Sequence, residues 1–157
     1  MPIGHLSVRY NNEQNASRYT NLTKDEQYFM FSLWSIARSP LILGCELTDM
    51  DEFSLSLVQN RDMVACNQFS TENRMVYRRE QTGAWAAKGQ GGEVWLGAFN
   101  LSDAPAASAT LLSELGLSGQ WRAVDVWTGK EVSAADGVVA LPLRPHQGTL
   151  IKLTPQL

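Results

Sequence analysis

Three residues near the start of the sequence carry side chains that can bind a polar substrate or move a proton: His5, Arg18 and Glu46. Glu46 directly follows a short apolar run, and in barrels of parallel strands the chemistry lies at the carboxyl ends of the strands. His5 stands near the end of the first expected strand. Arg18 belongs to the loop from Val8 to Thr20, which would lie at the same end. We take these three residues as candidates for a substrate rim.

Each candidate also has a structural explanation. A single histidine is more often held by structural partners than used as a ligand. Arg18 can pair with a neighbouring acid as well as with a substrate, and Glu46 can be a solvated or loop-stabilising carboxylate. The second histidine, His146, has no partner at the spacing of a metal site, so a role in a turn is expected. The residues therefore assign no catalytic group and no metal site.

Composition narrows the class of protein. The chain has 157 residues, of which 44% are hydrophobic and 18% charged, as in a globular protein of one domain or two small ones. A net charge of −3 does not resemble the basic surface of a nucleic-acid binder. No apolar run is long enough for a membrane span, and the first residues lack the features of a signal peptide. We expect neither a nucleic-acid nor a membrane partner.

The cysteines, Cys45 and Cys66, are too few for a disulfide framework. They are expected as small buried apolar residues, and a single bridge between them stays open.

The first half of the chain predicts alternating strands and helices. Thr23 to Glu26 has the pattern of a capping box, and Met30, Leu33, Trp34 and Ala37 then form one helical stripe that should face a core. Pro40 is expected to end this helix. The run Leu41 to Leu43 predicts a strand buried on both faces.

A second helix is expected from about Asp49, with an interruption at Asn60 to Asp62. Residues 1–8 resemble the end of another strand, so residues 1–68 predict two βα units. Two units are too few to close a (β/α)8 barrel, which needs eight strands. The first half is therefore expected to be the end of a larger barrel.

The second half predicts short strands and turns. Strands are expected at 75–79, 85–87, 93–100, 121–127, 138–143 and 149–153, and residues 104–109 form a loop or a weak edge strand. Thr128-Gly129 and Asp136-Gly137 are turn signals, of which the second is the stronger hairpin signal. The fold class is accordingly mixed, with a partial barrel at 1–70 and an antiparallel β-sandwich at 71–157. Four of the five tryptophans fall in the sandwich, where core packing is favoured over sugar stacking.

Several stretches resemble the α-galactosidase (melibiase) family, glycoside hydrolase family 27. The most specific stretches lie between residues 19 and 68, and the sandwich stretches are weaker. The stretches are Gly4-His5-Leu6-Ser7, Arg18-Tyr19-Thr20, Leu22 to Gln27, Leu33 to Leu41, Asp51 to Leu57, Val64 to Gln68, Ala98 to Asp103, Val126 to Gly129 and Leu143 to His146. The resemblance implies the last part of the barrel followed by the C-terminal sandwich.

The resemblance also implies an activity, the hydrolysis of terminal α-galactosides with retention of configuration and without a cofactor. Retention requires two carboxylates about 5–5.5 Å apart. In the family both are aspartates from earlier barrel strands that this sequence does not contain. These 157 residues are therefore expected to be inactive alone.

A carbohydrate-binding or accessory sandwich module is the alternative function. Self-association through the uncovered barrel end is also expected. Family members are often secreted, periplasmic or lysosomal, and the sequence does not select among these locations.

Overall fold

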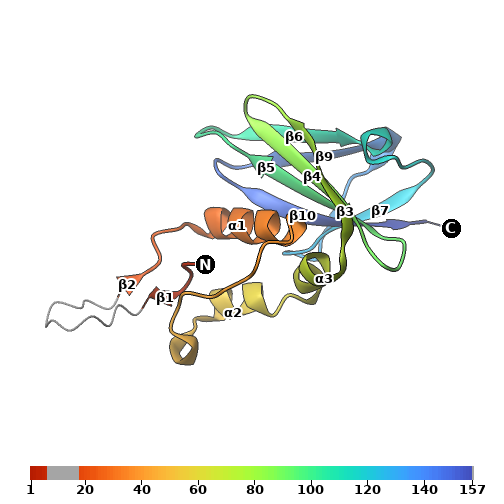
Figure 1. Cartoon of the computed structure of the whole chain (residues 1–157). Coiled ribbons are helices and arrows are strands. Elements are labelled where there is room, and N and C mark those ends of the chain that lie inside the picture. The colour runs from red at the N-terminus through yellow and green to blue at the C-terminus, as the bar shows by residue number, and fades with distance from the viewer. Residues whose placement is uncertain (7–17, 157) are drawn as a thin grey trace, which may run out of the picture.

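The computed structural model describes residues 1–6 and 18–156 (Figure 1). The helices are α1 (Lys24–Ile36), α2 (Glu52–Val58) and α3 (Arg61–Phe69), with short 3-10 turns η1 (Leu47–Asp49), η2 (Leu112–Leu115) and η3 (Ala135–Gly137). The strands are β1 (His5–Leu6), β2 (Arg18–Tyr19), β3 (Thr71–Arg78), β4 (Thr82–Lys88), β5 (Val94–Asn100), β6 (Ala106–Leu111), β7 (Trp121–Asp125), β8 (Glu131–Val132), β9 (Val138–Leu143) and β10 (Gly148–Pro155).

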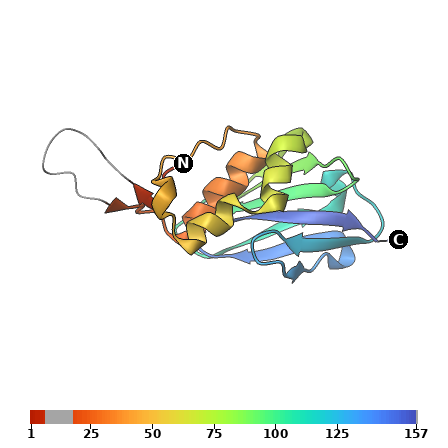
Figure 2. The ribbon, with the colours of Figure 1, turned by 90° about the horizontal axis from the view of Figure 1, so that it is seen from below.

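The main sheet separates two hydrophobic cores. Its six antiparallel strands run in the order β3-β4-β5-β10-β7-β8, and the pair β6-β9 forms a second, smaller sheet. One core lies between the main sheet and the helices, and the other lies between the two sheets (Figure 2). Strand β5 is buried along its whole length because Trp95 and Phe99 face the helices while Val94 and Leu96 face the second sheet. The expected antiparallel sandwich and its central strand are confirmed.

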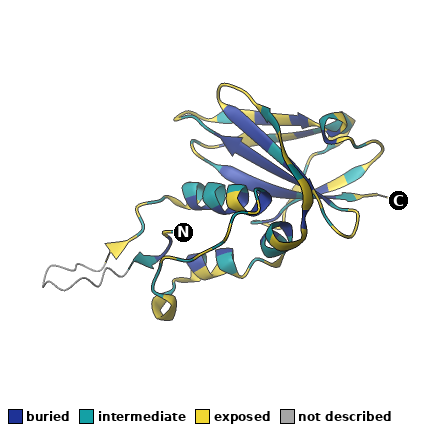
Figure 3. Cartoon of the chain, viewed as in Figure 1, coloured by how far each residue is buried: buried dark blue, intermediate teal, exposed yellow. Residues whose placement is uncertain are grey.

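Helix α1 begins as the capping box predicts but turns a partly different face to the core. Thr23 accepts a hydrogen bond from the Glu26 amide at 3.2 Å, and the Glu26 carboxylate accepts from the Thr23 amide at 2.7 Å. The buried residues include Phe31 and Ile36, whereas Trp34 is 36% exposed. Met30 and Leu33 pack against the core as predicted, but Trp34 does not, because the most buried face of the helix also carries small and polar residues (Figure 3).

Pro40 was expected to end the same helix, but the helix already ends at Ile36. Arg38 adopts a left-handed backbone with φ of 54°, and the Ser39 amide donates to the Trp34 carbonyl at 2.8 Å. This pattern is a Schellman motif, which usually has glycine at the left-handed position. Here the Arg38 guanidinium donates to carbonyls at the end of α3, including that of Ser70 at 3.0 Å. Those bonds hold α1 and α3 together.

The run Leu41 to Leu43 is not a strand, which corrects the sequence prediction. Ile42 is 72% exposed, and the described residues pair with this run only on one side. The predicted second helix is two helices, α2 and α3, with Asn60 capping the second by accepting from the Met63 amide at 3.0 Å. The expected order of helices is confirmed, but the barrel strand between them is not present as a strand.

Two details of the predicted sandwich also change. Asp136-Gly137 is not a hairpin turn, because it joins β8 of the main sheet to β9 of the smaller sheet. The hairpin lies at Thr128-Gly129 instead, between β7 and β8. Residues 104–109 contain the start of β6, which pairs with β9 throughout, so the edge-strand interpretation is confirmed.

Gly148 allows α1 to lie directly on the main sheet. A Cβ at this position would stand 2.6 Å from the Phe29 Cα and 2.8 Å from a Phe99 ring carbon. The Phe29 and Phe99 rings themselves pack with centroids 4.9 Å apart. A side chain at Gly148 would have to push the helix backbone away from β10.

We expect Gly148→Ala to lower the free energy of unfolding by ~1–3 kcal/mol, the usual cost of overpacking a core. Urea denaturation monitored by tryptophan fluorescence measures this change. Gly83→Ala is the matched control, since its Cβ would meet only ordinary contacts at 3.8 Å and beyond in a neighbouring strand. Equal stability of the Gly148→Ala variant and the unmodified chain would show that α1 does not depend on this close approach.

Candidate functional site

The three rim candidates lie on adjacent backbone segments at the end of the chain that carries β1 and β2. Leu6 pairs with Arg18 and His5 pairs with Tyr19 in the short β1–β2 ladder. The Glu46 amide donates to the His5 carbonyl at 2.8 Å. The predicted proximity of these residues is therefore present in their backbones. Most of the loop from Val8 to Thr20, expected to face the same site, lies outside the described residues.

His5 is held by two partners. Its Nδ1 lies 2.9 Å from the Asp49 carboxylate, and its ring stacks on Tyr19 with centroids 5.1 Å apart and planes 23° apart. The His5 side chain is only 17% exposed, whereas Tyr19 is 60% exposed. Asp49 and Tyr19 were not among the sequence candidates. No sequence pattern predicts either contact. The His5–Asp49 contact depends on the η1 turn, and the His5–Tyr19 contact depends on the β1–β2 register.

Glu46 caps the η1 turn. Its Oε1 accepts hydrogen bonds from the Thr48 amide at 3.3 Å and from the Thr48 hydroxyl at 2.7 Å. This geometry favours the loop-stabilising explanation of Glu46 over direct use as an acid or base. Arg18 lies in an exposed strand of two residues beside Tyr19.

Asp51 forms the support beneath this end of the chain. Its carboxylate accepts from the Ser54 amide and the Ser54 hydroxyl, both at 2.8 Å, and so caps α2. These hydrogen bonds, the amide bond foremost, lower the pKa of the Asp51 carboxyl from its ordinary value. Gly4 sits directly over the pair, since a Cβ there would stand 3.1 Å from the Ser54 hydroxyl. Asp51 thus connects α2 to the residue that precedes His5.

The arrangement around His5 can bind hydroxyl groups, but its carboxylates are engaged in structural contacts. Glu46 contacts Thr48, Asp49 contacts His5, and Asp51 contacts Ser54. No group of three or more His, Cys, Asp or Glu side chains among the described residues could hold a metal ion. His146 has a left-handed backbone in the turn before β10, as a turn role predicts, and its Nε2 lies 2.7 Å from Asp103.

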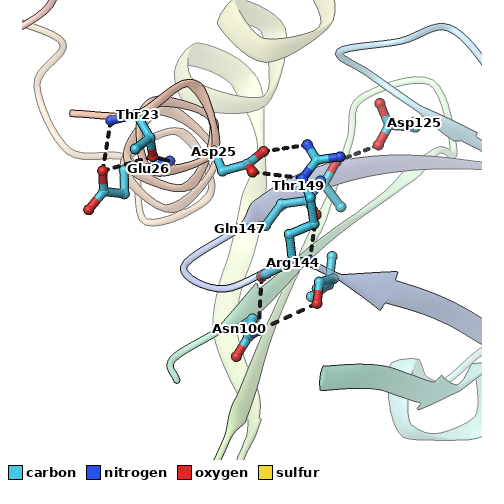
Figure 4. A network of polar contacts seen from close by, with 9 residues as sticks. Thr23, Asp25, Glu26, Asn100, Asp125, Arg144, Gln147 and Thr149 are labelled. Carbon is cyan, nitrogen blue, oxygen red and sulfur yellow. Dashed lines mark hydrogen bonds and ion pairs between the residues drawn. The ribbon is translucent and has the colours of Figure 1, made fainter. Parts of the chain in front are cut away.

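Two carboxylates away from this end form polar contacts, one between α1 and the sandwich and one within the sandwich (Figure 4). Asp25 forms a two-pronged contact with the Arg144 guanidinium, with its Oδ2 2.7 Å from Nε. Asp125 accepts from Thr149 through one oxygen, and its other oxygen accepts from the Trp127 and Thr128 amides at 3.0 and 2.8 Å. Asp25 lies in the first turn of α1, and it also forms this long-range ion pair, which the sequence did not predict.

The tryptophans of the sandwich mainly pack. Trp95 is 1% exposed, and Trp127 donates its indole N–H to the Ser32 hydroxyl at 2.8 Å. Trp85 and Trp121 are half-buried beside the two cores. Core packing is therefore the main role of these rings, as expected.

Both cysteines are free thiols, so the bridge that the sequence left open does not form. Cys66 is buried and Cys45 half-buried, as small apolar residues would be. Burial raises the pKa of the Cys66 thiol to about 12, and it also raises the pKa of Cys45. Neither thiol is a nucleophile at neutral pH in these surroundings.

An apolar hollow of about 330 Å³ opens between α1, α3 and the run before Gly44. Its lining includes Phe31, Leu41, Leu43 and Met63.

The described helices include none that is long and apolar enough to cross a bilayer.

Comparison with known proteins defines the class. The family model of the α-galactosidase C-terminal β-sandwich domain matches residues 80–153. Alpha-galactosidase 2 of Arabidopsis thaliana is 27% identical across 85% of this chain, and the α-galactosidase of Coffea arabica is 26% identical across 86%. The chain spans 35% and 37% of the length of these two relatives.

Solved structures extend the match over the helices as well. A Bacillus halodurans C-125 protein, described as a candidate α-N-acetylgalactosaminidase, is 38% identical to this chain, with a TM-score of 0.92. The match covers 99% of this chain and 38% of the Bacillus halodurans chain. A family 27 β-L-arabinopyranosidase of Geobacillus stearothermophilus is 35% identical with a TM-score of 0.87, over 99% and 36%. The fold is therefore that of the C-terminal region of the α-galactosidases. The chain belongs to this group as the C-terminal part of a glycoside hydrolase family 27 α-galactosidase-like protein.

We expect Asp51→Ala to lower the free energy of unfolding at neutral pH by ~1 kcal/mol, the usual cost of losing a helix cap. Asp51→Asn, which keeps a capping side chain and loses the charge, should cost less than half of that. Because folding lowers the Asp51 pKa, the charge stabilises the fold fully above the ordinary value of 3.8 and ceases to do so as the pH falls through the lower folded value.

Urea denaturation of the three proteins from about pH 7 down to about pH 3 measures this dependence. The difference between the unmodified chain and Asp51→Asn should shrink toward the acid end, where the carboxyl begins to be protonated. A difference that is independent of pH would contradict the role given to the Asp51 charge.

Proposed function

We propose that this chain completes a retaining glycoside hydrolase that hydrolyses terminal α-galactosides or glycosides of a closely related sugar. The observation that carries the proposal is the structural match over 99% of the chain, at 35% to 38% identity, to relatives that are named as glycosidases. The match includes the helices and both sheets, so it is not limited to a widespread sandwich. The curated relatives named above are α-galactosidases.

We also propose that residues 1–70 are the end of the barrel and residues 71–157 the sandwich. The backbone of residues 1–5 runs beside residues 42–46 in the same direction. The Gly44 amide donates to the Met1 carbonyl at 3.0 Å, the Met1 amino group donates to the Ile42 carbonyl, and Glu46 donates to His5. Met1 thus forms backbone hydrogen bonds with both Ile42 and Gly44, two residues apart on the neighbouring segment, which is the hydrogen-bond pattern of parallel strands. This supports a seventh and an eighth barrel strand.

The exposed side of the run before Gly44 supports the same proposal. Ile42 is 72% exposed, between Leu41 and Leu43 of the apolar hollow, and Leu47 in the following η1 turn is 65% exposed. Parallel strands are normally buried on both faces. We infer that the remaining strands of the barrel cover these side chains in the whole enzyme. The boundary at residue 70 is supported by the end of α3 at Phe69 and the start of β3 at Thr71.

The substrate proposal follows from sugar shape. The relatives are named for α-galactose, N-acetylgalactosamine and β-L-arabinopyranose. L-arabinopyranose has the ring configuration of D-galactopyranose without its hydroxymethyl group, and N-acetylgalactosamine has that configuration with an acetamido group in place of the C2 hydroxyl. The three sugars therefore share the hydroxyls at C3 and C4. His5, Arg18 and Glu46 are proposed to border the sugar site. The two catalytic aspartates are proposed to come from the earlier barrel strands, with no cofactor.

We expect the purified 157-residue chain to show no hydrolysis of 4-nitrophenyl α-galactoside above the buffer rate, because both catalytic aspartates are proposed to come from the earlier barrel strands. Release of nitrophenol measures the activity, with a full-length α-galactosidase as the positive control. Hydrolysis that saturates with substrate and survives removal of contaminating enzymes would contradict the assignment of catalysis to other strands.

We expect a chimera to be active in which this chain replaces the matching C-terminal part of the Geobacillus stearothermophilus enzyme. The expected result is a soluble protein that hydrolyses 4-nitrophenyl β-L-arabinopyranoside. His5→Ala in the chimera should raise KM more than it lowers kcat, since a rim residue binds the sugar without reacting. Gln90→Ala, in an exposed turn of the sandwich, is the control. A soluble chimera without activity would contradict the proposed completion of the barrel.

We expect the isolated chain to self-associate as its concentration rises, through the uncovered side of Ile42 and Leu47. Sedimentation velocity over a hundredfold range of concentration measures the mean mass. Ile42→Asp should restore a monomer, whereas Leu111→Asp, which changes a 47% exposed leucine on the sandwich, should not. A monomer at every concentration would show that this surface does not associate.

A further inference from the structure

We propose that the far end of the sandwich carries a binding site for a neutral oligosaccharide, formed by Trp121, Gln120, Gln156, Ser133 and Asp136. Gln120 and Trp121 lie at the start of β7, Ser133 and Asp136 lie between β8 and β9, and Gln156 follows β10. Together they line one hollow. Strand β7 and the C-terminus lie at the end of the molecule opposite to β1 and β2 (Figure 1), and the hollow is lined there by Trp121 of β7 and by Gln156. Neither the family match nor the proposed hydrolysis requires a site here.

The size of the hollow suits a short sugar. Its volume is about 600 Å³, within the range of about 300–1,000 Å³ that small-molecule sites occupy. A single aromatic ring, that of Trp121, lines it. A long stacking platform needs several rings in a row, so we expect one or two sugar units to be held.

The walls are fixed by the main sheet. Trp121 pairs with Pro155 in the β7–β10 ladder, and the Gln156 amide donates to the Gln120 carbonyl at 2.9 Å. The Trp121 indole N–H donates to the Ser118 carbonyl at 3.0 Å, which fixes the ring. The opposite wall turns sharply at Asp136, whose φ is 53°. The site is therefore formed before a ligand arrives, which lowers the cost of binding.

The polar groups match what a sugar presents. The glutamine side chains each offer two donors and an acceptor, and Gln120 and Gln156 are both exposed. The Ser133 hydroxyl accepts from the Ala135 amide at 3.4 Å, so its own proton can be donated outward. The Asp136 carboxylate is a further acceptor. Sugars bind where such groups meet their hydroxyls while an aromatic ring meets their C–H groups.

Charge excludes other classes of small ligand. The described residues that line the hollow include no lysine, arginine or histidine, and the one charged member is the acidic Asp136. A phosphate or a carboxylate would be repelled there. A lipid chain would leave the two amides and the hydroxyl without partners, which is costly. A neutral polyhydroxyl ligand satisfies both the ring and the polar groups.

NMR titration of the ¹⁵N-labelled 157-residue chain tests the proposal, with melibiose, raffinose, mannotetraose and inorganic phosphate as separate probes. We expect at least one of the three sugars to give saturable shifts at Trp121, Ser133 and Gln156, and phosphate to give none. No saturable shift with any sugar up to ~50 mM, a range that would detect a Kd weaker than 1 mM, would overturn the proposal. Saturation centred on Tyr19, or an equal response to phosphate, would overturn it as well.

Variants assign the contacts. Trp121→Ala should weaken binding about tenfold, the change that ~1.4 kcal/mol of lost stacking produces. Because Trp121 also packs on the inter-sheet core, the exposed pair Gln120→Ala with Gln156→Ala gives a second test that leaves the core unchanged. It too should weaken binding about tenfold. Trp34→Ala and Gln90→Ala, at exposed positions elsewhere, are the controls. Unchanged affinity in the glutamine double variant would overturn the site.

Discussion

The close contact of α1 with the main sheet determines how the two halves of this chain are joined. Gly148 leaves room for the Phe29 backbone, and the rings of Phe29 and Phe99 fill the space on either side. Since β5 and β10 are adjacent central strands, the contact anchors the helix to the most buried part of the sheet. The helices α2 and α3 then pack beside α1 over the same core.

Polar contacts surround this apolar contact and select one arrangement of it. The pairs Asp25–Arg144 and Trp127–Ser32 join α1 to the loops of the sandwich. Buried Asn100 binds the carbonyls of Ala104 and Arg144 at 2.7 and 2.8 Å, which fixes the loop that carries Arg144 (Figure 4). An exposed ion pair contributes little to stability by itself. The Asp25–Arg144 pair, however, has two hydrogen bonds, and the Asn100 side-chain amide holds the Arg144 loop in place. The pair therefore fixes the orientation of α1.

Local patterns in the sequence predicted what local interactions determine. The capping box at Thr23, the doubly apolar strand at Val94 to Asn100 and the strand at Val138 to Leu143 all form as expected. The errors arise where distant residues decide. The buried face of α1 depends on which side meets Gly148, and Asp136-Gly137 crosses between sheets because β9 pairs with β6. The apolar run before Gly44 predicts a strand buried on both faces, but the described residues pair with it along one edge only and leave Ile42 exposed.

The candidate rim shows the same division. Residue type and position were sufficient to select His5, Arg18 and Glu46, whose backbones are adjacent. Their partners Asp49 and Tyr19 could not be predicted, because the contacts arise from the η1 turn and from a ladder two residues long. The central claim is that a barrel bearing two aspartates precedes these residues. The most direct test is to read the DNA upstream of the Met1 codon in all three frames. The account predicts barrel strands that carry the two aspartates there, and a coding sequence without them would contradict it.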